Sequence, residues 1–174
     1  MRILLMGHPN VGKSVVFNRI TGANVTESNY PGTTVDYEKG YVRIGHEEME
    51  VIDVPGTFSL EPKDKAEEVA VKMLEGNKDS VVVCIIDSTK IERGLYLALE
   101  IIERSSRVVV VLNMWDIAED KSINIDVEKL RQILGVPVVP TIAVSGEGIK
   151  ELISRISGAT SVKIERVMKN VGGS

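Results

Sequence analysis

Residues 7–14 (Gly-His-Pro-Asn-Val-Gly-Lys-Ser) combine side chains that can hold a phosphate group. Gly7 and Gly12 carry no Cβ atom, so successive backbone N–H groups can approach an anion closely. Lys13 supplies a full positive charge for the β- and γ-phosphates, and the Ser14 hydroxyl is a hard oxygen ligand for Mg²⁺. A glycine-rich turn arising by chance is the alternative, but the order Gly-x-x-x-x-Gly-Lys-Ser predicts a nucleotide phosphate site.

The elements on either side of this loop fit that prediction. The apolar run 3–6 precedes it and predicts a strand, while residues 13–21 predict a helix that ends at Gly22. The N-terminus of such a helix adds a partial positive charge next to a bound phosphate. The context is therefore strand, phosphate loop and helix.

A second motif, Asp53-Val54-Pro55-Gly56, lies at the carboxyl end of another predicted strand. Residues 37–44 and 48–54 alternate as strands around a turn at residues 45–46, which predicts a hairpin. At the end of its second strand, the Asp53 carboxylate can hold Mg²⁺ through water. The Gly56 N–H is then free to meet a terminal phosphate.

The buried run 108–112 leads into Asn113-Met114-Trp115-Asp116, whose polar side chains suit a purine. An Asp116 carboxylate can accept two parallel hydrogen bonds from the N1–H and amino group of guanine, whereas adenine lacks that donor pair. The Asn113 amide can both donate to and accept from a purine edge. An ordinary Asn- and Asp-rich turn is the alternative. Further on, a backbone N–H near Ala143 or Val144 is placed to meet the exocyclic oxygen of the purine.

Buried strands alternate with helices along the rest of the chain, which predicts parallel β-α-β units. The expected fold is α/β: a three-layer P-loop NTPase fold with a mostly parallel six-stranded sheet, one antiparallel edge strand and helices on both faces. Ligands of such sheets bind at the carboxyl ends of the strands, where each of these motifs falls. The further strands are expected at 80–86, 108–112 and 136–143, the further helices at 64–75, 91–103, 126–134 and 149–156, and irregular loops at 23–36 and 57–63.

Composition excludes several other classes of protein. The 174 residues carry a formal net charge of −4, which disfavours a nucleic-acid surface. The single cysteine, Cys84, lies in an apolar run and predicts a buried thiol, and His8 and His46 have no ligand spacing for a transition metal. With no apolar run of ~20 residues and no signal-peptide pattern, the chain is expected to be a soluble cytosolic domain.

The motifs described above, taken in their order along the chain, resemble those of the Ras-like P-loop GTPases. Two loop stretches point to one family within that group. Residues 29–35 (Asn-Tyr-Pro-Gly-Thr-Thr-Val) and 53–60 (Asp-Val-Pro-Gly-Thr-Phe-Ser-Leu) look like the two switch loops in the G domain of ferrous iron transport protein B. The resemblance covers a G domain over residues 1–157, leaving 158–174 as a C-terminal tail or a linker to a helical and membrane portion outside this sequence.

The resemblance implies further roles for individual residues. Thr34 aligns with the switch threonine that ligates Mg²⁺ and senses the γ-phosphate, with Thr33 as a substitute, and Gly56 would contact the γ-phosphate. Asn10 matches the asparagine that helps hold K⁺ against the phosphates. The expected catalytic residues are Asn10, Lys13, Thr34 and Gly56, and the metal ligands are Ser14, Thr34 and Asp53 for Mg²⁺ and Asn10 for K⁺. The expected nucleotide site comprises Gly7, Asn10, Val11, Gly12, Lys13, Ser14, Val15, Thr33, Thr34, Asp53, Gly56, Asn113, Met114, Asp116, Ala143 and Val144.

Three residues depart from the pattern of related enzymes. Thr57 stands where Ras-type enzymes have the glutamine that orients water, so intrinsic turnover is expected to be slow. Met114 replaces the usual lysine of the Asn-Lys-x-Asp motif, and Ile142 stands where many relatives have serine.

The resulting hypothesis is a GTP- and GDP-binding switch domain that hydrolyses GTP slowly, with Mg²⁺ and with K⁺ as a candidate activator. It would regulate iron(II) uptake at the cytoplasmic face of the inner membrane, through a membrane-embedded portion of the same polypeptide. A weak homo-oligomer is an open alternative, and no nucleic-acid partner is expected. Two other functions compete: an Era-like ribosome-assembly GTPase, which the acidic balance disfavours, and a nucleotide sensor with negligible turnover.

Overall fold

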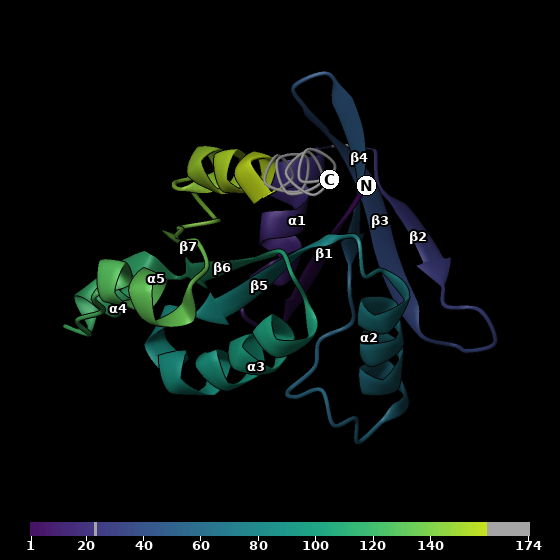
Figure 1. The fold of residues 1–174 in the computed structure, drawn as a ribbon, viewed down its shortest axis with the longest axis horizontal. Coiled ribbons are helices and arrows are strands. Elements are labelled where there is room, and N and C mark those ends of the chain that lie inside the picture. The colour runs from purple at the N-terminus through teal and green to yellow at the C-terminus, as the bar shows by residue number, and fades with distance from the viewer. Residues whose placement is uncertain (23, 160–174) are drawn as a thin grey trace, which may run out of the picture.

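The computed structural model describes residues 1–22 and 24–159, which form one seven-stranded sheet with helices on both faces (Figure 1). The strand order is β2-β3-β4-β1-β5-β6-β7, and β4, β1, β5, β6 and β7 are mutually parallel. The strands are β1 (Arg2–Gly7), β2 (Thr26–Asn29), β3 (Asp36–Ile44), β4 (Glu47–Asp53), β5 (Val81–Asp87), β6 (Val108–Asn113) and β7 (Val138–Pro140). The predicted three-layer α/β fold is confirmed.

The strand count differs from the prediction of six strands with one antiparallel edge. β2 lies inside residues 23–36, which the sequence predicted as a loop, and it pairs antiparallel with β3, itself antiparallel to β4. Its four residues, Thr-Glu-Ser-Asn, are mostly exposed, so no apolar alternation marks them as a strand. The antiparallel part of the sheet therefore has two strands beyond β4.

Helices follow the predicted positions with small shifts. Asp64 and Asp126 cap α2 and α5, because each carboxylate accepts a hydrogen bond from the backbone N–H three residues later. The short helix α4 was missed, and β7 is shorter than the predicted strand over 136–143. The helices are α1 (Lys13–Thr21), α2 (Lys65–Gly76), α3 (Ile91–Arg104), α4 (Trp115–Asp120), α5 (Val127–Leu134), a 3₁₀ turn η1 (Ser88–Lys90) and a helix over 149–159.

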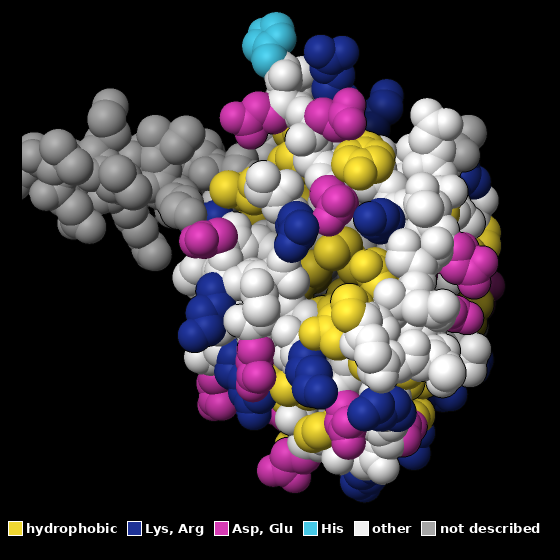
Figure 2. Space-filling model, turned by 90° about the vertical axis from the view of Figure 1, so that its right-hand side faces the viewer, with side chains coloured by type: hydrophobic (Ala, Val, Ile, Leu, Met, Phe, Trp, Pro, Cys, Tyr) yellow, Lys and Arg dark blue, Asp and Glu magenta, His cyan; other side chains and the backbone are white. Residues whose placement is uncertain are grey.

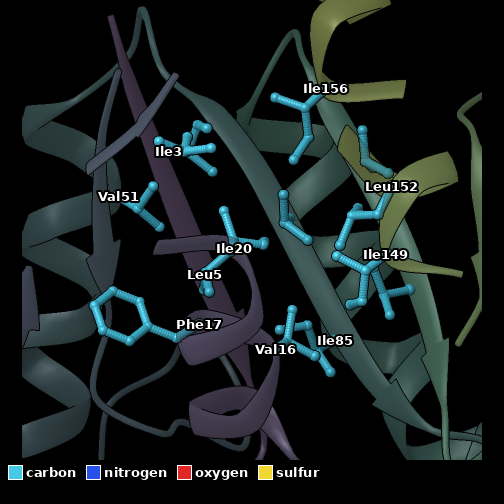
Figure 3. Packing of buried hydrophobic residues seen from close by; sticks show 14 of the residues in the cluster. Ile3, Leu5, Val16, Phe17, Ile20, Val51, Ile85, Ile149, Leu152 and Ile156 are labelled. Carbon is cyan, nitrogen blue, oxygen red and sulfur yellow. The ribbon is translucent and has the colours of Figure 1, made fainter. Parts of the chain in front are cut away.

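Two hydrophobic cores, one on each face of the sheet, hold the layers together. On one face α1 and the helix over 149–159 pack on the central strands, where Phe17 and Leu152 are fully buried against β1 and β5 (Figure 3). On the other face α2 and α3 pack through residues such as Met73 and Leu97. Because β1, β5 and β6 are covered on both faces, they read as continuous apolar runs.

Residues outside these cores bear on the other predictions. Cys84 is a buried thiol as predicted, and burial raises its pKa to about 12. Among the residues described, no helix is long and apolar enough to cross a bilayer. The predicted tail, 158–174, lies outside the described residues except for 158 and 159, which continue the last helix.

Candidate nucleotide site

The loop between β1 and α1 is held in shape by the protein interior. Asn10 and Gly12 both have positive φ values, 65° and 85°. A Cβ on Gly7 would lie 2.6 Å from the Ile85 carbonyl oxygen, and one on Gly12 would lie 2.3 Å from Asn113 Nδ2. Glycine is therefore required at these positions by neighbouring strand ends, in addition to the close approach of a phosphate predicted from the sequence.

Lys13, Ser14 and Asp53 come together at the carboxyl ends of β1 and β4. Lys13 Nζ forms an ion pair with Asp53 Oδ1, and the Ser14 hydroxyl donates to Asp53 Oδ2 at 3.3 Å. The Lys13 and Asp53 side chains are only 11% and 9% exposed, so this is a nearly buried pair. The positive and negative groups predicted to face phosphate and Mg²⁺ thus satisfy one another here.

A cavity of about 350 Å³ opens beside this pair. It has a strongly acidic lining, because Glu27, Asp36 and Glu38 from β2 and β3 join Asp53 around it. Carboxylates and hydroxyls are the ligands that Mg²⁺ prefers, so the oxygen atoms of Ser14 and Asp53 fit that ion.

A second cavity, of about 390 Å³, lies on the other side of Lys13 and is lined by Asn10 and Gly56 among others. Gly56 reaches the loop because the Thr57 N–H donates to the Gly7 carbonyl at 3.1 Å. A Cβ on Gly56 would be 3.1 Å from Pro9 Cγ, so a glycine allows this close approach. The structure therefore places the predicted phosphate residues of both loops around one space.

Thr57 cannot orient a water molecule as the glutamine of Ras-type enzymes does. The residue is fully buried, and its hydroxyl donates to the Ser59 carbonyl at 2.7 Å. The loop after it is fixed from outside by two carboxylates that the sequence analysis missed. Glu67 accepts from the N–H groups of Phe58 and Lys63, and Glu100 accepts from that of Leu60.

The two candidate threonines of the first switch loop differ in their contacts. The Thr33 hydroxyl donates to the Tyr30 carbonyl at 2.9 Å and accepts from the Val35 N–H, so it closes a local turn. Thr34 is exposed, and its hydroxyl has no partner among the described residues. Neither residue lines the two cavities at Lys13, because this loop extends beyond the sheet between β2 and β3 (Figure 1).

Asn113 at the end of β6 is buried and joins three segments. Its Nδ2 donates to the Val11 carbonyl at 3.0 Å, and its Oδ1 accepts from the Thr141 hydroxyl and the Ala143 N–H. The amide is therefore used mainly inside the protein, and one Nδ2 hydrogen remains for a purine edge. No local sequence pattern could have shown these partners, which come from distant parts of the chain.

Asp116 and Met114 lie at the start of α4. The Asp116 carboxylate is half-buried and has no partner among the described residues, as a carboxylate reserved for a ligand would be. Met114 has a φ of 57° and caps α4, and its Cε lies 3.9 Å from the Cβ position of Gly12. Its side chain thus lies next to the phosphate loop, at the position of the lysine in the Asn-Lys-x-Asp motif. Val11, within the loop itself, is buried, and Val15 is half-buried in the first turn of α1.

The sequence analysis missed Arg19, which extends from α1 to the loop after β7. Its Nε donates to the Ala143 carbonyl at 2.9 Å, and a terminal nitrogen donates to the Val144 carbonyl at 2.5 Å. More than 120 residues separate the partners, so only the folded chain reveals the contact.

Charge is distributed without a single-sign field on the face beside β2 and β3. Figure 2 shows Lys and Arg side chains interspersed there with Asp and Glu and with patches of hydrophobic surface.

The strand order, the loop between β1 and α1, and the polar groups at the ends of β4 and β6 define a P-loop NTPase fold of the G-domain type.

Comparison with known proteins agrees with this class. The profile of the family described as "Ferrous iron transport protein B" matches residues 1–156, and the chain belongs to that family. It is 39% identical over 158 residues to an Fe(2+) transport protein A/Fe(2+) transporter FeoB fusion protein of Porphyromonas gingivalis, covering 90% of this chain and 19% of that protein. It is 37% identical to the Fe(2+) transporter FeoB of Leptospira biflexa, covering 94% and 24%. The chain thus spans about a fifth to a quarter of the length of these relatives.

Solved structures show the same similarity. The G domain of the Thermotoga maritima FeoB iron transporter superposes with a TM-score of 0.85 at 37% identity, covering 91% of this chain and 98% of that one. A cytosolic-domain structure of the same protein in a GMPPNP form gives a TM-score of 0.85 at 36% identity, covering 91% and 63%.

Proposed function

We propose that the chain is the GTP-binding and GTP-hydrolysing switch domain of a prokaryotic ferrous iron transporter, acting at the cytoplasmic face of the membrane. The observation that carries this proposal is that Lys13 and Ser14 line two cavities, one shared with Gly56 and the other with Asp53. The Asp116 carboxylate has no partner among the described residues and is left for a base. The names of its relatives, which include structures in GDP and GMPPNP forms, support guanine nucleotide as the ligand.

Phosphate binding would replace the contacts that Lys13 makes now. The ammonium group would leave Asp53 for the β- and γ-phosphates, which carry more negative charge. Asp53 and Ser14 would then hold Mg²⁺, which neutralises charge on the phosphate oxygens during hydrolysis. The first switch loop would supply a third oxygen ligand for Mg²⁺, the exposed Thr34 hydroxyl. The Thr33 hydroxyl would not serve, because it already donates to the Tyr30 carbonyl.

Specificity for guanine would come from Asp116. A carboxylate accepts the N1–H and amino hydrogens of guanine together, and an adenine in the same pose would place its N1 lone pair against the negative charge.

Slow turnover follows from the position of Thr57. Thr57 stands where Ras-type enzymes have the glutamine that positions water. Because its hydroxyl donates to the Ser59 carbonyl, Thr57 has no free polar group to take over that role. Asn10 lies exposed beside Gly56, where its amide oxygen could help to bind K⁺ near the phosphates. A cation there would stabilise negative charge in the transition state, as an arginine finger does in other G proteins.

Transport would be regulated through the two loops at 24–36 and 57–63, whose order depends on the bound nucleotide. Within the described residues no group of three His, Cys, Asp or Glu side chains can hold a metal ion, so iron would pass through another part of the transporter.

The test is GTP turnover with Mg²⁺ in matched K⁺ and Na⁺ buffers, on wild type and Asn10→Ala. We expect K⁺ to raise turnover by about tenfold and the substitution to abolish the difference, because the added charge stabilisation depends on the Asn10 amide. Equal rates in both salts for wild type would contradict the role of Asn10.

A nucleotide sensor is the second candidate, and the buried Thr57 favours it. Tight GTP binding with no turnover in either salt would support the sensor over the enzyme.

A further inference from the structure

The loop after β7, residues 143–146, is attached to α1 by one side chain. Arg19 donates to two successive carbonyls of this loop, from Nε to Ala143 at 2.9 Å and from a terminal nitrogen to Val144 at 2.5 Å. Gly146 lies on the same guanidinium, because a Cβ built there would be 3.5 Å from an Arg19 terminal nitrogen. A planar, always charged fork makes such a double contact with little loss of side-chain freedom.

The backbone N–H groups of this loop are occupied with one exception. The Ala143 N–H donates to Asn113 Oδ1, and those of Ser145 and Gly146 both donate to the Ile142 carbonyl. Only the Val144 N–H has no partner among the described residues. It is therefore the one donor of the loop that is ready for a ligand.

Arg19 determines where that donor points. In a trans peptide the N–H lies opposite the C=O of the same unit, and the described part of the chain, which includes this loop, has no cis peptide bonds. Because the Ala143 carbonyl is drawn to Arg19, the Val144 N–H of the same peptide is directed away from α1. The Val144 carbonyl, held by the same guanidinium, restricts rotation on the other side of the residue.

We propose that Arg19 is a positioning residue that holds the Val144 N–H in place as the donor to the O6 atom of a bound guanine. The proposal rests on the proposed function. Arg19 also connects the two ends of the nucleotide site through one helix, since α1 begins at Lys13, the residue proposed to bind the phosphates, and carries Arg19 six residues later. The position of the loop that would contact the base is thereby fixed relative to the phosphate loop.

The test measures dissociation of GDP and of 6-thio-GDP from wild type, Arg19→Ala and Arg19→Lys. Sulfur at position 6 is a weak acceptor, while the N1–H and amino group remain. We expect Arg19→Ala to speed GDP release by about tenfold and 6-thio-GDP release by no more than about twofold. Arg19→Lys, which keeps the charge but not the fork, should give an intermediate rate for GDP.

Arg131→Ala is the matched control. Arg131 also donates from two guanidinium nitrogens to backbone, both to the Val138 carbonyl at 3.0 and 2.7 Å, but at the first residue of β7 and not in the loop after it. It should lower thermal stability and leave both release rates unchanged.

Three outcomes would overturn the proposal. GDP release from Arg19→Ala could equal that of wild type, or both nucleotides could be released faster by the same factor, which would indicate general loosening. The same acceleration in Arg131→Ala would have that meaning too. Failure of the wild type to bind GDP would instead overturn the proposed function, and the wild-type measurements separate the two cases.

Discussion

The two ends of the candidate nucleotide site differ in how they meet a ligand. At the phosphate end, Lys13, Ser14 and Asp53 are already bonded to one another. At the base end, the Asp116 carboxylate and the Val144 N–H have no partner among the described residues, and Asn113 and Arg19 hold the surrounding backbone.

This difference indicates that the two ends contribute to binding in different ways. Phosphate binding must exchange a nearly buried ion pair for new contacts, so part of the attraction between Lys13 and phosphate is offset by its separation from Asp53. The base end needs no such exchange, and its groups are held in advance. Preorganised groups add affinity because little order is lost when the ligand arrives. Three substitutions test the comparison, taken from the largest expected effect to the smallest.

Lys13→Ala should have the largest effect, a loss of nucleotide affinity of about a thousandfold, because it removes the full charge that faces two phosphates. It should also lower the melting temperature of the ligand-free chain, since Asp53 loses its ion-pair partner in a nearly buried place. Calorimetric titration with GDP and thermal unfolding measure the two effects. Lys72→Ala, on the exposed face of α2, makes the same charge change and should alter neither. An unchanged melting temperature for Lys13→Ala would contradict the self-paired phosphate end.

Asp116→Asn should lower affinity for GDP by about a hundredfold, because an amide can accept only one of the two hydrogen bonds that guanine offers. Affinity for xanthosine diphosphate should rise, since the amide donates to its extra carbonyl. The ligand-free melting temperature should stay unchanged because Asp116 has no partner to lose. Asp120→Asn, at the other end of α4, serves as the control. Retained GDP affinity in Asp116→Asn would place the base elsewhere.

Asn113→Ala should reduce the free energy of unfolding by about 2 kcal/mol, because three hydrogen bonds of a buried amide are lost. Chemical denaturation measures this change. Since the amide joins Val11 of the phosphate loop to the base loop, GDP affinity should fall as well. A drop in affinity without any loss of stability would show that Asn113 acts on the ligand alone and does not hold the phosphate loop and the loop after β7 together.

The sequence allowed most of the fold to be predicted, because its buried strands and capped helices carry local signals. The run at Val81–Asp87 and the capping aspartates at 64 and 126 are examples. β2 escaped prediction because its polar, exposed residues carry no apolar period, and α4 because it has only six residues.

The candidate site could be predicted as far as its motifs, since each lies at the end of a strand. The contacts that hold it could not be predicted, because the partners of Asn113 and Arg19 are distant in the chain. The ion pair between Lys13 and Asp53 was likewise missed, since both residues were assigned to a ligand.

The ladder between β3 and β4 has a consequence for how the first switch loop can move. Seven residue pairs, from Glu38 opposite Asp53 to Ile44 opposite Glu47, join the strand after that loop to the strand that ends at Asp53, the proposed Mg²⁺ ligand. Sliding β3 by one residue against β4 would turn Val42 out of the core, because side chains alternate between faces. A shift in register is therefore costly, so we expect any movement of residues 29–35 in the proposed switch to begin with separation of β3 and β4 at the Glu38–Asp53 end.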